Sequence, residues 1–402
     1  MLGNDPWQTG SYPTRRWRLF GMPTFLVVAI ALGWLLINGP LAFELGRFFL
    51  DDDGNTTLEL PEELVLARLP WTFGWCADPA ADGVLLALPN EGNPAWQIDA
   101  IEHWTRPWKE AKREPIPAAW RMATQPDWQN DTGLVCHFGF NSPVTRDRSL
   151  LAAMYHPVQQ VPQTRIIALP EGHEIARLEA IPSGANGKCI TWHPTENVLA
   201  IGGYGTVTLA AGPDWKARTL ATAGRDRIEW ETRARAGQEE CGYYPNENPT
   251  QLLFSDDGTL LITGMDRGMR VYDWKEVREA SAQLPAPRHA VDGVLVPHPL
   301  FSFKMTFSVA YDARRSLVLW CENDGKLKYL KVTTGERGTL LALTKRYSMS
   351  RLHLCATGDA LVAEIVRFGR SENGPVVLAV LDYAKLLQRG GIEPADACDK
   401  DR

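Results

Sequence analysis

A unit of two apolar runs joined by a tight polar turn recurs along the chain, and this repetition restricts the possible folds more than any other feature. The clearest copy is LLFSDDGTLLITGMDRGMRVYDW, residues 252–274. Its first two runs flank the Asp257-Gly258 turn, where glycine accepts the positive φ that a hairpin turn needs. The run at residues 269–273 alternates as a half-buried strand does. One copy therefore predicts three consecutive antiparallel strands.

Further copies carry the same apolar–turn–apolar pattern. They begin at Phe73, Leu134, Cys189, Phe307 and Leu352. Since no long amphipathic helical pattern interrupts them, an all-β architecture is expected, and their spacing is close to that of propeller blades. The sequence predicts a β-propeller of six to seven four-stranded blades over residues 57–392. A seventh blade would have to lie within residues 212–250 or 283–305.

The two ends of the predicted ring have separate roles. Residues 57–66, TLELPEELVL, precede the first copy of the unit. In propellers an N-terminal strand often completes the last blade and closes the ring, which removes an exposed sheet edge. We expect this segment to play that role, and we expect residues 393–402 to form a C-terminal tail.

Two parts of the clearest copy resemble the WD repeat family. FSDDGTLLITG, residues 254–264, is similar to the family's F-S-P-D-G-x-x-L-A-S-G stretch, with Asp256 in place of proline. MRVYDW, residues 269–274, is similar to its V-R-L-W-D strand, with Tyr272 in place of tryptophan. TWHPTENVLAIGG, which begins at Thr191, is a second match. The resemblance implies a degenerate WD-repeat-like propeller, and we interpret it as a membrane-anchored protein of a bacterium.

An uncharged apolar run, TFLVVAIALGWLLINGPLAF, precedes the repeats at residues 24–43. About 20 apolar residues in a helix cross the hydrocarbon layer of a membrane. A single transmembrane helix is therefore predicted over residues 20–43, after a cytoplasmic segment, 1–19, and before an acidic linker, 44–56. The predicted anchor residues are Phe25, Leu26, Val27, Val28, Ile30, Leu32, Trp34, Leu35, Leu36 and Ile37.

The charges around this run predict its orientation. Three arginines lie between residues 15 and 18, and an acidic run, Asp51–Asp53, follows. Positive charge tends to stay in the cytoplasm, so the propeller is expected to lie in the periplasm or outside the cell, anchored in the inner (cytoplasmic) membrane. A cleaved signal peptide and a buried soluble helix are the alternatives.

Residues 94–131 do not show the blade pattern, and they are rich in tryptophan. We interpret them as an insertion whose rings pack on the blade beneath, dock a partner or lie at the membrane surface, because tryptophan is enriched at hot spots and in the headgroup layer. A polar loop at residues 237–250 is a second irregular stretch. The candidate partner-binding residues are Trp96, Trp104, Trp108, Trp120, Trp128, Tyr243 and Tyr244.

The sequence offers little catalytic chemistry. It has no G-x-S-x-G elbow, no P-loop and no dinucleotide fingerprint after a strand, and its eight histidines form no zinc-like pair. No catalytic, cofactor-binding or metal-binding residue is therefore predicted. The net charge of −6 argues against a nucleic-acid partner. Cysteines 76, 189, 321 and 355 lie in apolar strand patterns and are expected to be buried.

These observations favour a non-catalytic binding or scaffold protein. We expect an accessory subunit of a membrane or envelope complex, whose partners are other membrane or envelope proteins and the lipid bilayer through residues 20–43. The alternative is an envelope enzyme, a hydrolase or lyase, with a site at the central mouth of the propeller. Charged side chains converging at one mouth would favour the enzyme, whereas a neutral channel with an exposed Trp patch would favour binding.

Overall fold

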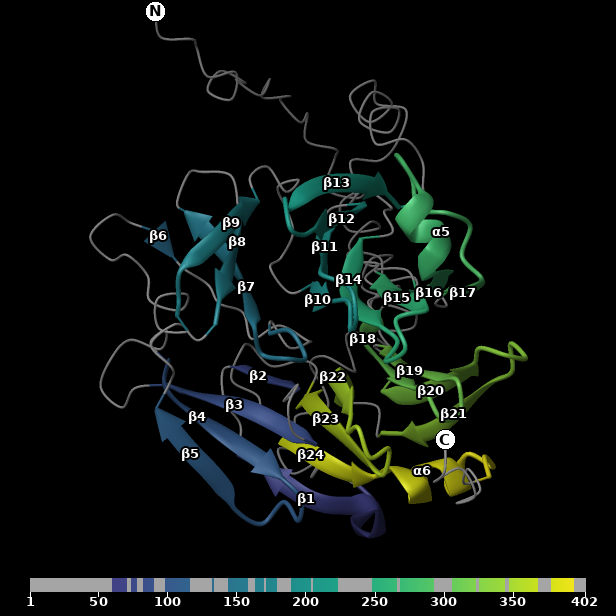
Figure 1. Ribbon diagram of the computed structural model, residues 1–402. Helices are drawn as coiled ribbons and strands as arrows, with labels where there is room; N and C mark the ends of the chain where they lie inside the picture. The colour runs from purple at the N-terminus through teal and green to yellow at the C-terminus, as the bar shows by residue number, and fades with distance from the viewer. Residues whose placement is uncertain are drawn as a thin grey trace, which may run out of the picture. The chain divides into compact units, whose positions relative to one another are not determined.

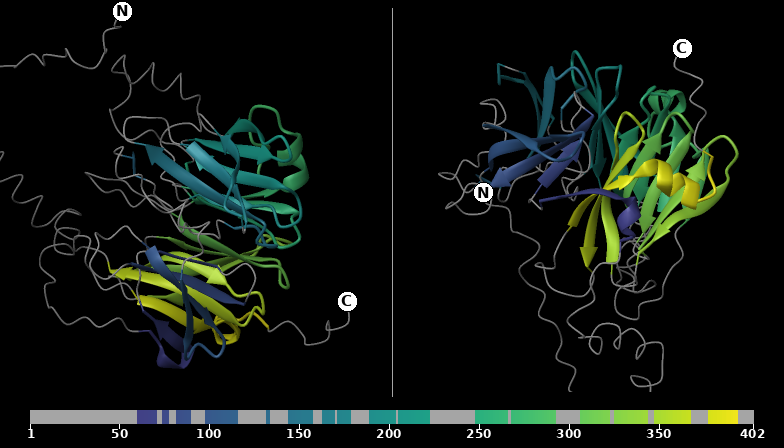
Figure 2. Two further views of the ribbon diagram at one scale, coloured as in Figure 1. Left: turned by 60° about the vertical axis from the view of Figure 1, so that its left-hand side comes forward. Right: turned by 90° about the horizontal axis from the view of Figure 1, so that it is seen from below.

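Six four-stranded antiparallel sheets follow one another along the part of the chain that is described in the computed structural model (Figure 1). The described residues are 60–70, 74–77, 82–89, 98–115, 132–133, 144–157, 163–169, 171–178, 189–203, 205–222, 248–265, 268–292, 306–322, 325–343, 347–367 and 377–393. They all belong to one unit of the chain, Thr57–Pro297 with Ser302–Arg402. The sheets lie around a common centre as the blades of a propeller, which confirms the predicted all-β fold with six blades (Figures 1 and 2).

Each blade is a meander whose first strand lies nearest the centre. Blade 1 contains β2 (Gly74–Ala77), β3 (Gly83–Pro89), β4 (Ile98–Thr105) and β5 (Ala111–Pro115), and blade 2 contains β6 (Thr132–Gly133), β7 (Leu150–Pro157), β8 (Gln163–Ala168) and β9 (Glu174–Leu178). Blade 3 contains β10 (Ile190–Trp192), β11 (Val198–Gly203), β12 (Thr206–Ala211) and β13 (Lys216–Ala221), and blade 4 contains β14 (Pro249–Phe254), β15 (Leu260–Met265), β16 (Gly268–Asp273) and β17 (His289–Asp292). Blade 5 contains β18 (Thr306–Asp312), β19 (Leu317–Glu322), β20 (Lys326–Lys331) and β21 (Arg337–Ala342), and blade 6 contains β22 (Tyr347–Leu354), β23 (Ala360–Arg367), β24 (Val377–Asp382) and β1 (Val65–Leu69).

The N-terminal strand closes the ring as predicted. Strand β1 pairs with β24 and becomes the outermost strand of blade 6. Its bounds differ from the predicted 57–66, because Pro61 precedes a single 3-10 turn, η2 (Glu62–Leu64). Leu60 and Leu64 are buried in the apolar core between blades 5 and 6 instead of lying in a strand.

The apolar side chains pack mainly between the faces of neighbouring blades. Between blades 6 and 1, for example, Val84 and Leu86 lie in one buried cluster with Val362 and Val380. Similar clusters join blades 2 and 3, 3 and 4, 4 and 5, and 5 and 6. The expected burial of four cysteines is confirmed, since Cys76, Cys189, Cys321 and Cys355 are all buried. Burial on both faces explains why the inner strands read as nearly continuous apolar runs.

Two short helices follow the third strands of blades 4 and 6. Helix α5 (Trp274–Glu279) follows β16, and helix α6 (Tyr383–Arg389) follows β24. Arg218 of β13 donates hydrogen bonds to the carbonyls of Ala280 and Val277, at 2.6 and 3.2 Å, and so holds the end of α5 against blade 3. Helix α6 lies against β21 of blade 5 (Figures 1 and 2). Each helix therefore fastens its own blade to the preceding one.

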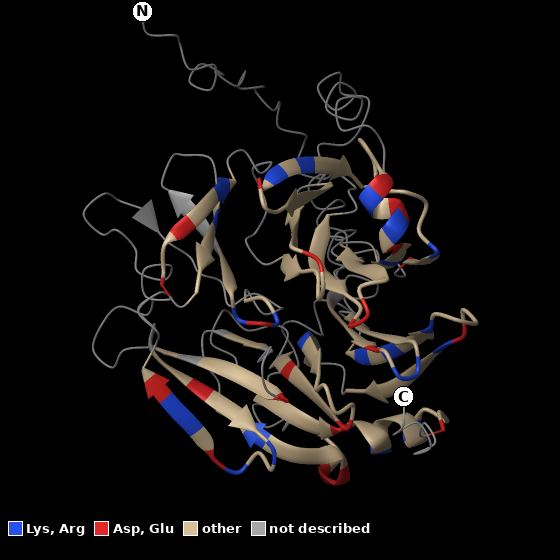
Figure 3. Cartoon of the chain, viewed as in Figure 1, with Lys and Arg blue, Asp and Glu red and all other residues tan. Residues whose placement is uncertain are grey.

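The structure differs from the sequence analysis in blade 1. Strands β4 and β5 occupy residues 98–105 and 111–115, so this part of the segment interpreted as an insertion completes an ordinary blade. The outer strand was missed because it carries Lys112 and Arg113, both exposed, in place of an apolar alternation. Figure 3 shows this concentration of charge on β5, while the inner strands are almost free of charge.

The stretches 212–250 and 283–305 contain no additional sheet among the residues that the structure describes. Strands β13 and β17 lie there, and they complete blades 3 and 4. The predicted transmembrane helix, 20–43, falls outside the described residues. Within them, neither helix is both long and apolar enough to span a bilayer.

Candidate functional site

The turns between the first and second strands share one hydrogen-bonding frame. In blade 4, the amide of Ser255 donates to the carbonyl of Leu260, and the amide of Gly258 donates to the carbonyl of Ser255. The outer hydrogen bond of this frame recurs in three other blades, for the pairs Thr145 and Leu150, His193 and Val198, and Cys355 and Ala360. The frame places the chain at positive φ in blades 2, 4 and 6, at Arg148, Gly258 and Gly358. The copies of the repeat therefore present equivalent positions around the ring.

Most polar side chains of these turns are used to hold the turn itself. Asp257 accepts hydrogen bonds from the Ser255 hydroxyl at 2.6 Å and from the Thr259 amide at 3.0 Å. Burial raises the pKa of the Asp257 carboxyl, but these hydrogen bonds together hold it below its usual range. Asp147 of blade 2 likewise accepts from Thr145 and Ser149, which lower its pKa. These carboxylates are therefore occupied by their own turns.

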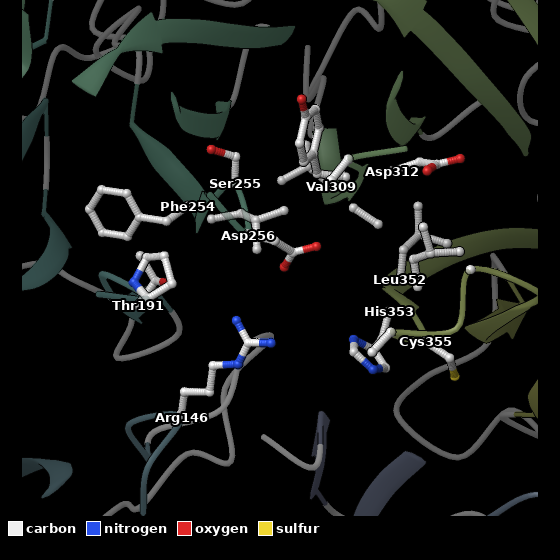
Figure 4. Close-up of a pocket in the computed structure, with 18 of the residues that line it drawn as sticks. Arg146, Thr191, Phe254, Ser255, Asp256, Val309, Asp312, Leu352, His353 and Cys355 are labelled. Atoms are coloured by element: carbon white, nitrogen blue, oxygen red, sulfur yellow. The ribbon is translucent and has the colours of Figure 1, made fainter. Parts of the chain in front are cut away.

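The residue directly after the first residue of each turn, which we call the turn-opening residue, is the exception, because it faces the centre of the ring. In blades 2 to 6 these residues are Arg146, Pro194, Asp256, Ala313 and Ala356, and all five line one cavity of about 770 Å³. Blade 1 contributes Asp82, so every blade reaches this mouth. Its walls also include Leu253, Val309 and His353 of the first strands (Figure 4). A mouth built this way offers five equivalent positions, of which only two carry a charge.

Arg146 and Asp256 point into the cavity from blades 2 and 4 and toward one another (Figure 4). Both residues are exposed, and neither side chain forms a hydrogen bond or an ion pair in the part of the chain that the structure describes. Although Asp256 is exposed as a residue, partial burial of its carboxyl group raises its pKa, and the nearby carboxylates of Asp257 and Asp312 raise this pKa further. The guanidinium of Arg146 acts in the opposite direction without cancelling the shift. The two groups thus interact through space while both remain available to a ligand.

The other charged groups of the mouth have partners. Asp82 accepts hydrogen bonds from the Thr357 amide at 3.2 Å and from its hydroxyl at 2.6 Å. Arg314 donates to the Thr357 carbonyl at 2.5 Å. Asp312 is almost fully buried and accepts from Arg315 Nη1 at 2.8 Å. These contacts join the turns of blades 5, 6 and 1, so this side of the mouth is preformed.

Blades 3, 4 and 5 are joined in a similar manner. His193 Nδ1 accepts from the Glu196 amide at 2.9 Å, which places the proton on Nε2, and Nε2 lies 3.0 Å from the Gly258 carbonyl oxygen. The Gln251 side chain forms two hydrogen bonds to the backbone of Val309, at 3.1 and 2.6 Å. Blade 3 is thereby joined to blade 4, and blade 4 to blade 5. Hydrogen bonds between blades therefore fix the spacing of the mouth residues of blades 3 to 6 and blade 1.

The nucleophilic groups of the mouth are not activated. Burial raises the pKa of the Cys355 thiol to about 12, so this group is protonated at neutral pH. The Ser255 hydroxyl donates to Asp257, and its oxygen accepts from the Leu260 amide at 2.9 Å. Burial raises the pKa of the Tyr311 phenol. Among the described residues, no group of three or more His, Cys, Asp or Glu side chains is arranged to hold a metal ion.

The sequence-predicted partner-binding residues lie elsewhere. Trp104 is half-buried on β4 and donates from Nε1 to Glu102 at 3.0 Å, and Trp108 is buried in the following turn. Both pack against the apolar cluster between blades 6 and 1. The other candidates fall outside the described residues: Trp96, Trp120, Trp128, Tyr243 and Tyr244. The predicted anchor residues between 25 and 37 also fall outside them. A docking role for these residues stays a prediction.

The mouth residues Arg146, Asp256 and His353 were not among the sequence candidates. A signal for two of them exists in the repeats, because Arg146 and Asp256 occupy the same turn-opening position in different copies. Charged side chains at one mouth are the feature that was expected to favour the enzyme alternative.

No protein-family model matches the chain, and no curated protein matches it. Among solved structures, it is similar to a chain of the mitotic checkpoint complex, with 11% sequence identity and a TM-score of 0.43 over 82% of this chain and 93% of that one. For the Dos1 propeller the identity is 9% and the TM-score 0.41, over 76% of this chain and 63% of that one. For the extracellular domain of BT4673 from B. thetaiotaomicron the identity is 12% and the TM-score 0.42, over 80% of this chain and 34% of that one. These values are too low to indicate a shared function.

Proposed function

We propose that the chain is a non-catalytic binding protein that holds a segment of a partner protein in the mouth of its propeller. The observation that carries this proposal is the pair Arg146 and Asp256, two charged groups that face the cavity and form no hydrogen bond or ion pair within the described residues. Every other charged group named above in the mouth is bonded to its own ring. A propeller fold is consistent with a binding or scaffold role.

The dimensions and rigidity of the mouth support binding. A volume of about 770 Å³ lies within the range of roughly 300–1,000 Å³ that is usual for ligand pockets. Because hydrogen bonds join the mouth residues of blades 3 to 6 and blade 1, little of this part of the site has to be ordered when a ligand enters. Preorganisation of this kind raises affinity by reducing the entropy lost on binding.

We further propose that the protein is an accessory subunit of a membrane or envelope complex. The apolar run at residues 24–43 supports this, together with the arginines before it and the acids after it. Limited proteolysis of spheroplasts tests the proposal. Cleavage of the propeller from outside, with the protein remaining in the membrane fraction, is expected, whereas protection until the membrane is lysed would contradict the predicted orientation.

An enzyme with its site in the same mouth is the second candidate, and one observation favours it. Asp256 has a raised pKa and shares the cavity with His353, a combination seen in general acid–base sites. The protonated thiol of Cys355 and the engaged hydroxyl of Ser255 argue for binding instead. We therefore place the binding function first.

Site-specific photo-crosslinking in the full chain tests where the partner binds. A photoreactive amino acid replaces Ala356, an exposed residue that lines the mouth, and in a matched control it replaces Ala217, an exposed residue on the outer strand β13. A third position, the exposed Lys109, reports on the tryptophan-bearing edge of blade 1. A discrete adduct from position 356 alone is expected. An adduct from position 109 alone would move the docking surface to blade 1 and would overturn the proposal.

A further inference from the structure

We infer, building on the proposed function, that the mouth selects partner segments that carry an acidic and a basic side chain close together. The acidic side chain would bind Arg146, and the basic one would bind Asp256. The juxtaposition that leads to this inference comes from the repeats. The turn-opening position is apolar in blades 3, 5 and 6, where it is Pro194, Ala313 and Ala356, and it bears opposite charges in blades 2 and 4.

The two charged residues do not neutralise one another. They point toward each other across the cavity (Figure 4), but no ion pair joins them, so each keeps its hydrogen-bonding capacity. Arg146 presents a planar guanidinium, which binds a carboxylate through two parallel hydrogen bonds. Asp256 presents a carboxylate with free acceptor positions. Together they form a fixed electric dipole, and a ligand of matching dipole replaces water at both ends.

The surroundings make this dipole directional. On the side of blades 4 and 5, the carboxylates of Asp257 and Asp312 lie near Asp256, and their negative potential favours a cation there. Between Asp256 and blade 6 the wall includes the apolar residues Ala313, Ala356 and Leu352, beside Asp312 and Arg314, whose side chains already have partners. The apolar part of this wall can contact the aliphatic stem of a lysine or arginine whose charged end reaches Asp256. A single cation, or a single anion, would leave one of the two groups desolvated and unpaired.

Selectivity follows mainly from repulsion. A segment with two acidic residues would place a carboxylate against Asp256, and one with two basic residues would place a cation against Arg146. Like-charge contacts of this kind discriminate against wrong partners more strongly than the matched pair favours the right one. The mouth therefore selects a segment by the signs of its two charges.

A peptide array read with the full chain in mild detergent tests this selectivity. Peptides of Ala, Gly and Ser carry two variable positions, separated by zero to three residues, filled by acid and base in both orders, by two acids, by two bases or by neither. The wild-type chain is expected to retain acid–base peptides at least about 10-fold better than the like-charge peptides. Arg146→Glu should move the preference to peptides with two bases, and Asp256→Lys should move it to peptides with two acids. An unchanged preference in both variants overturns the inference.

Two further variants separate this inference from the proposed function. Ala356→Trp narrows the mouth without changing its charge, and Ala217→Trp makes the same substitution on the outer strand β13. Loss of retention in Ala356→Trp, with an unchanged preference in the two charge variants, would keep the mouth as the binding site and remove the charge selection. Equal retention by all variants, or no retention of any peptide by the wild-type chain, would overturn both. Because Arg146 and Asp256 are exposed, the melting temperatures of the two charge variants should stay within a few degrees of wild type.

Discussion

Two contacts between neighbouring blades share one architecture but differ in chemistry. At the contact of blades 3 and 4, Trp274 at the start of α5 packs against His193 and Phe254, with ring centroids 5.2 and 5.0 Å apart. At the contact of blades 5 and 6, Tyr383 at the start of α6 donates from its hydroxyl to Asp312 Oδ2 at 3.1 Å. In both places an aromatic residue follows an aspartate at the end of a third strand and reaches the first turn of the preceding blade.

The difference lies in what the aromatic residue meets. The Trp274 side chain contacts mainly other rings, and its one hydrogen bond, from Nε1 to Glu196 at 3.2 Å, involves a half-buried residue. Tyr383 meets a carboxylate that is almost fully buried, and this carboxylate also binds the side chain of Arg315. Ring packing loses stability gradually as atoms are removed, whereas a buried ionic network loses most of it when one member is removed. The same position in two blades thus has two different sensitivities to mutation.

The largest effect is expected for Asp312→Ala. The substitution leaves Arg315 without its carboxylate in a site where both side chains are shielded from water, so a destabilisation of about 4 kcal/mol is expected. The midpoint of urea unfolding measures it. The matched control is Asp147→Ala in the first turn of blade 2, where an exposed carboxylate holds only its own turn. A loss of about 1 kcal/mol is expected there, and equal losses at the two positions would contradict the distinction.

A smaller effect, about 3 kcal/mol, is expected for Trp274→Ala at the other contact. The indole is buried against His193 and Phe254, and its removal leaves a cavity that the helix can partly fill by moving. Trp274→Phe keeps a six-membered ring and removes the hydrogen bond to Glu196 together with the rest of the indole, so it should cost about 1–2 kcal/mol. If the Phe variant were as unstable as the Ala variant, packing of the retained ring would contribute little, and the proposed role of ring packing would be wrong.

The sequence allowed the inner parts of these blades to be predicted but not their outer edges. First and second strands are buried on both faces, so their sequences are apolar and recognisable. The turns that join them carry characteristic residues. Gly258 is an example, because an added Cβ there would lie 2.5 Å from the His193 ring. Outer strands face water on one side, so β5 carries Lys112 and Arg113 and shows no apolar period. For the same reason, the expected insertion in blade 1 proved in part to be two of its strands.

The mouth could not be predicted because it depends on distances around the ring. Arg146 and Asp256 belong to different blades, and only the closed propeller brings them to one cavity. In the sequence, Asp256 stands where the WD repeat family has proline, and Arg146 is distinguished only by its position in the repeat. The transmembrane prediction rests on composition alone and concerns residues 20–43, so the propeller neither supports nor opposes it.

The smallest expected effect is a pH dependence of the free energy of unfolding, which only the contact of blades 5 and 6 should show. Burial raises the pKa of the Tyr383 phenol well above its ordinary value, and the carboxylate of Asp312 raises it further. In the unfolded chain the phenol loses its proton at about pH 10, whereas in the folded chain it keeps the proton. The folded state then binds more protons than the unfolded state, so the free energy of unfolding decreases as pH rises above about 10, by up to about 1.4 kcal/mol per pH unit.

Tyr383→Phe removes this dependence together with the hydrogen bond to Asp312. The variant should be less stable than wild type by about 1 kcal/mol at pH 8, and the difference should shrink and then reverse as the pH passes about 10. Urea unfolding at a series of pH values measures both curves, and the remaining tyrosines contribute equally to the two proteins. Trp274→Phe is the matched control, since indole does not titrate, and its difference from wild type should stay constant over the same range. A constant difference for Tyr383→Phe would mean that the phenol is not shielded from water at this contact, and the two contacts would then be alike in their chemistry as well as in their architecture.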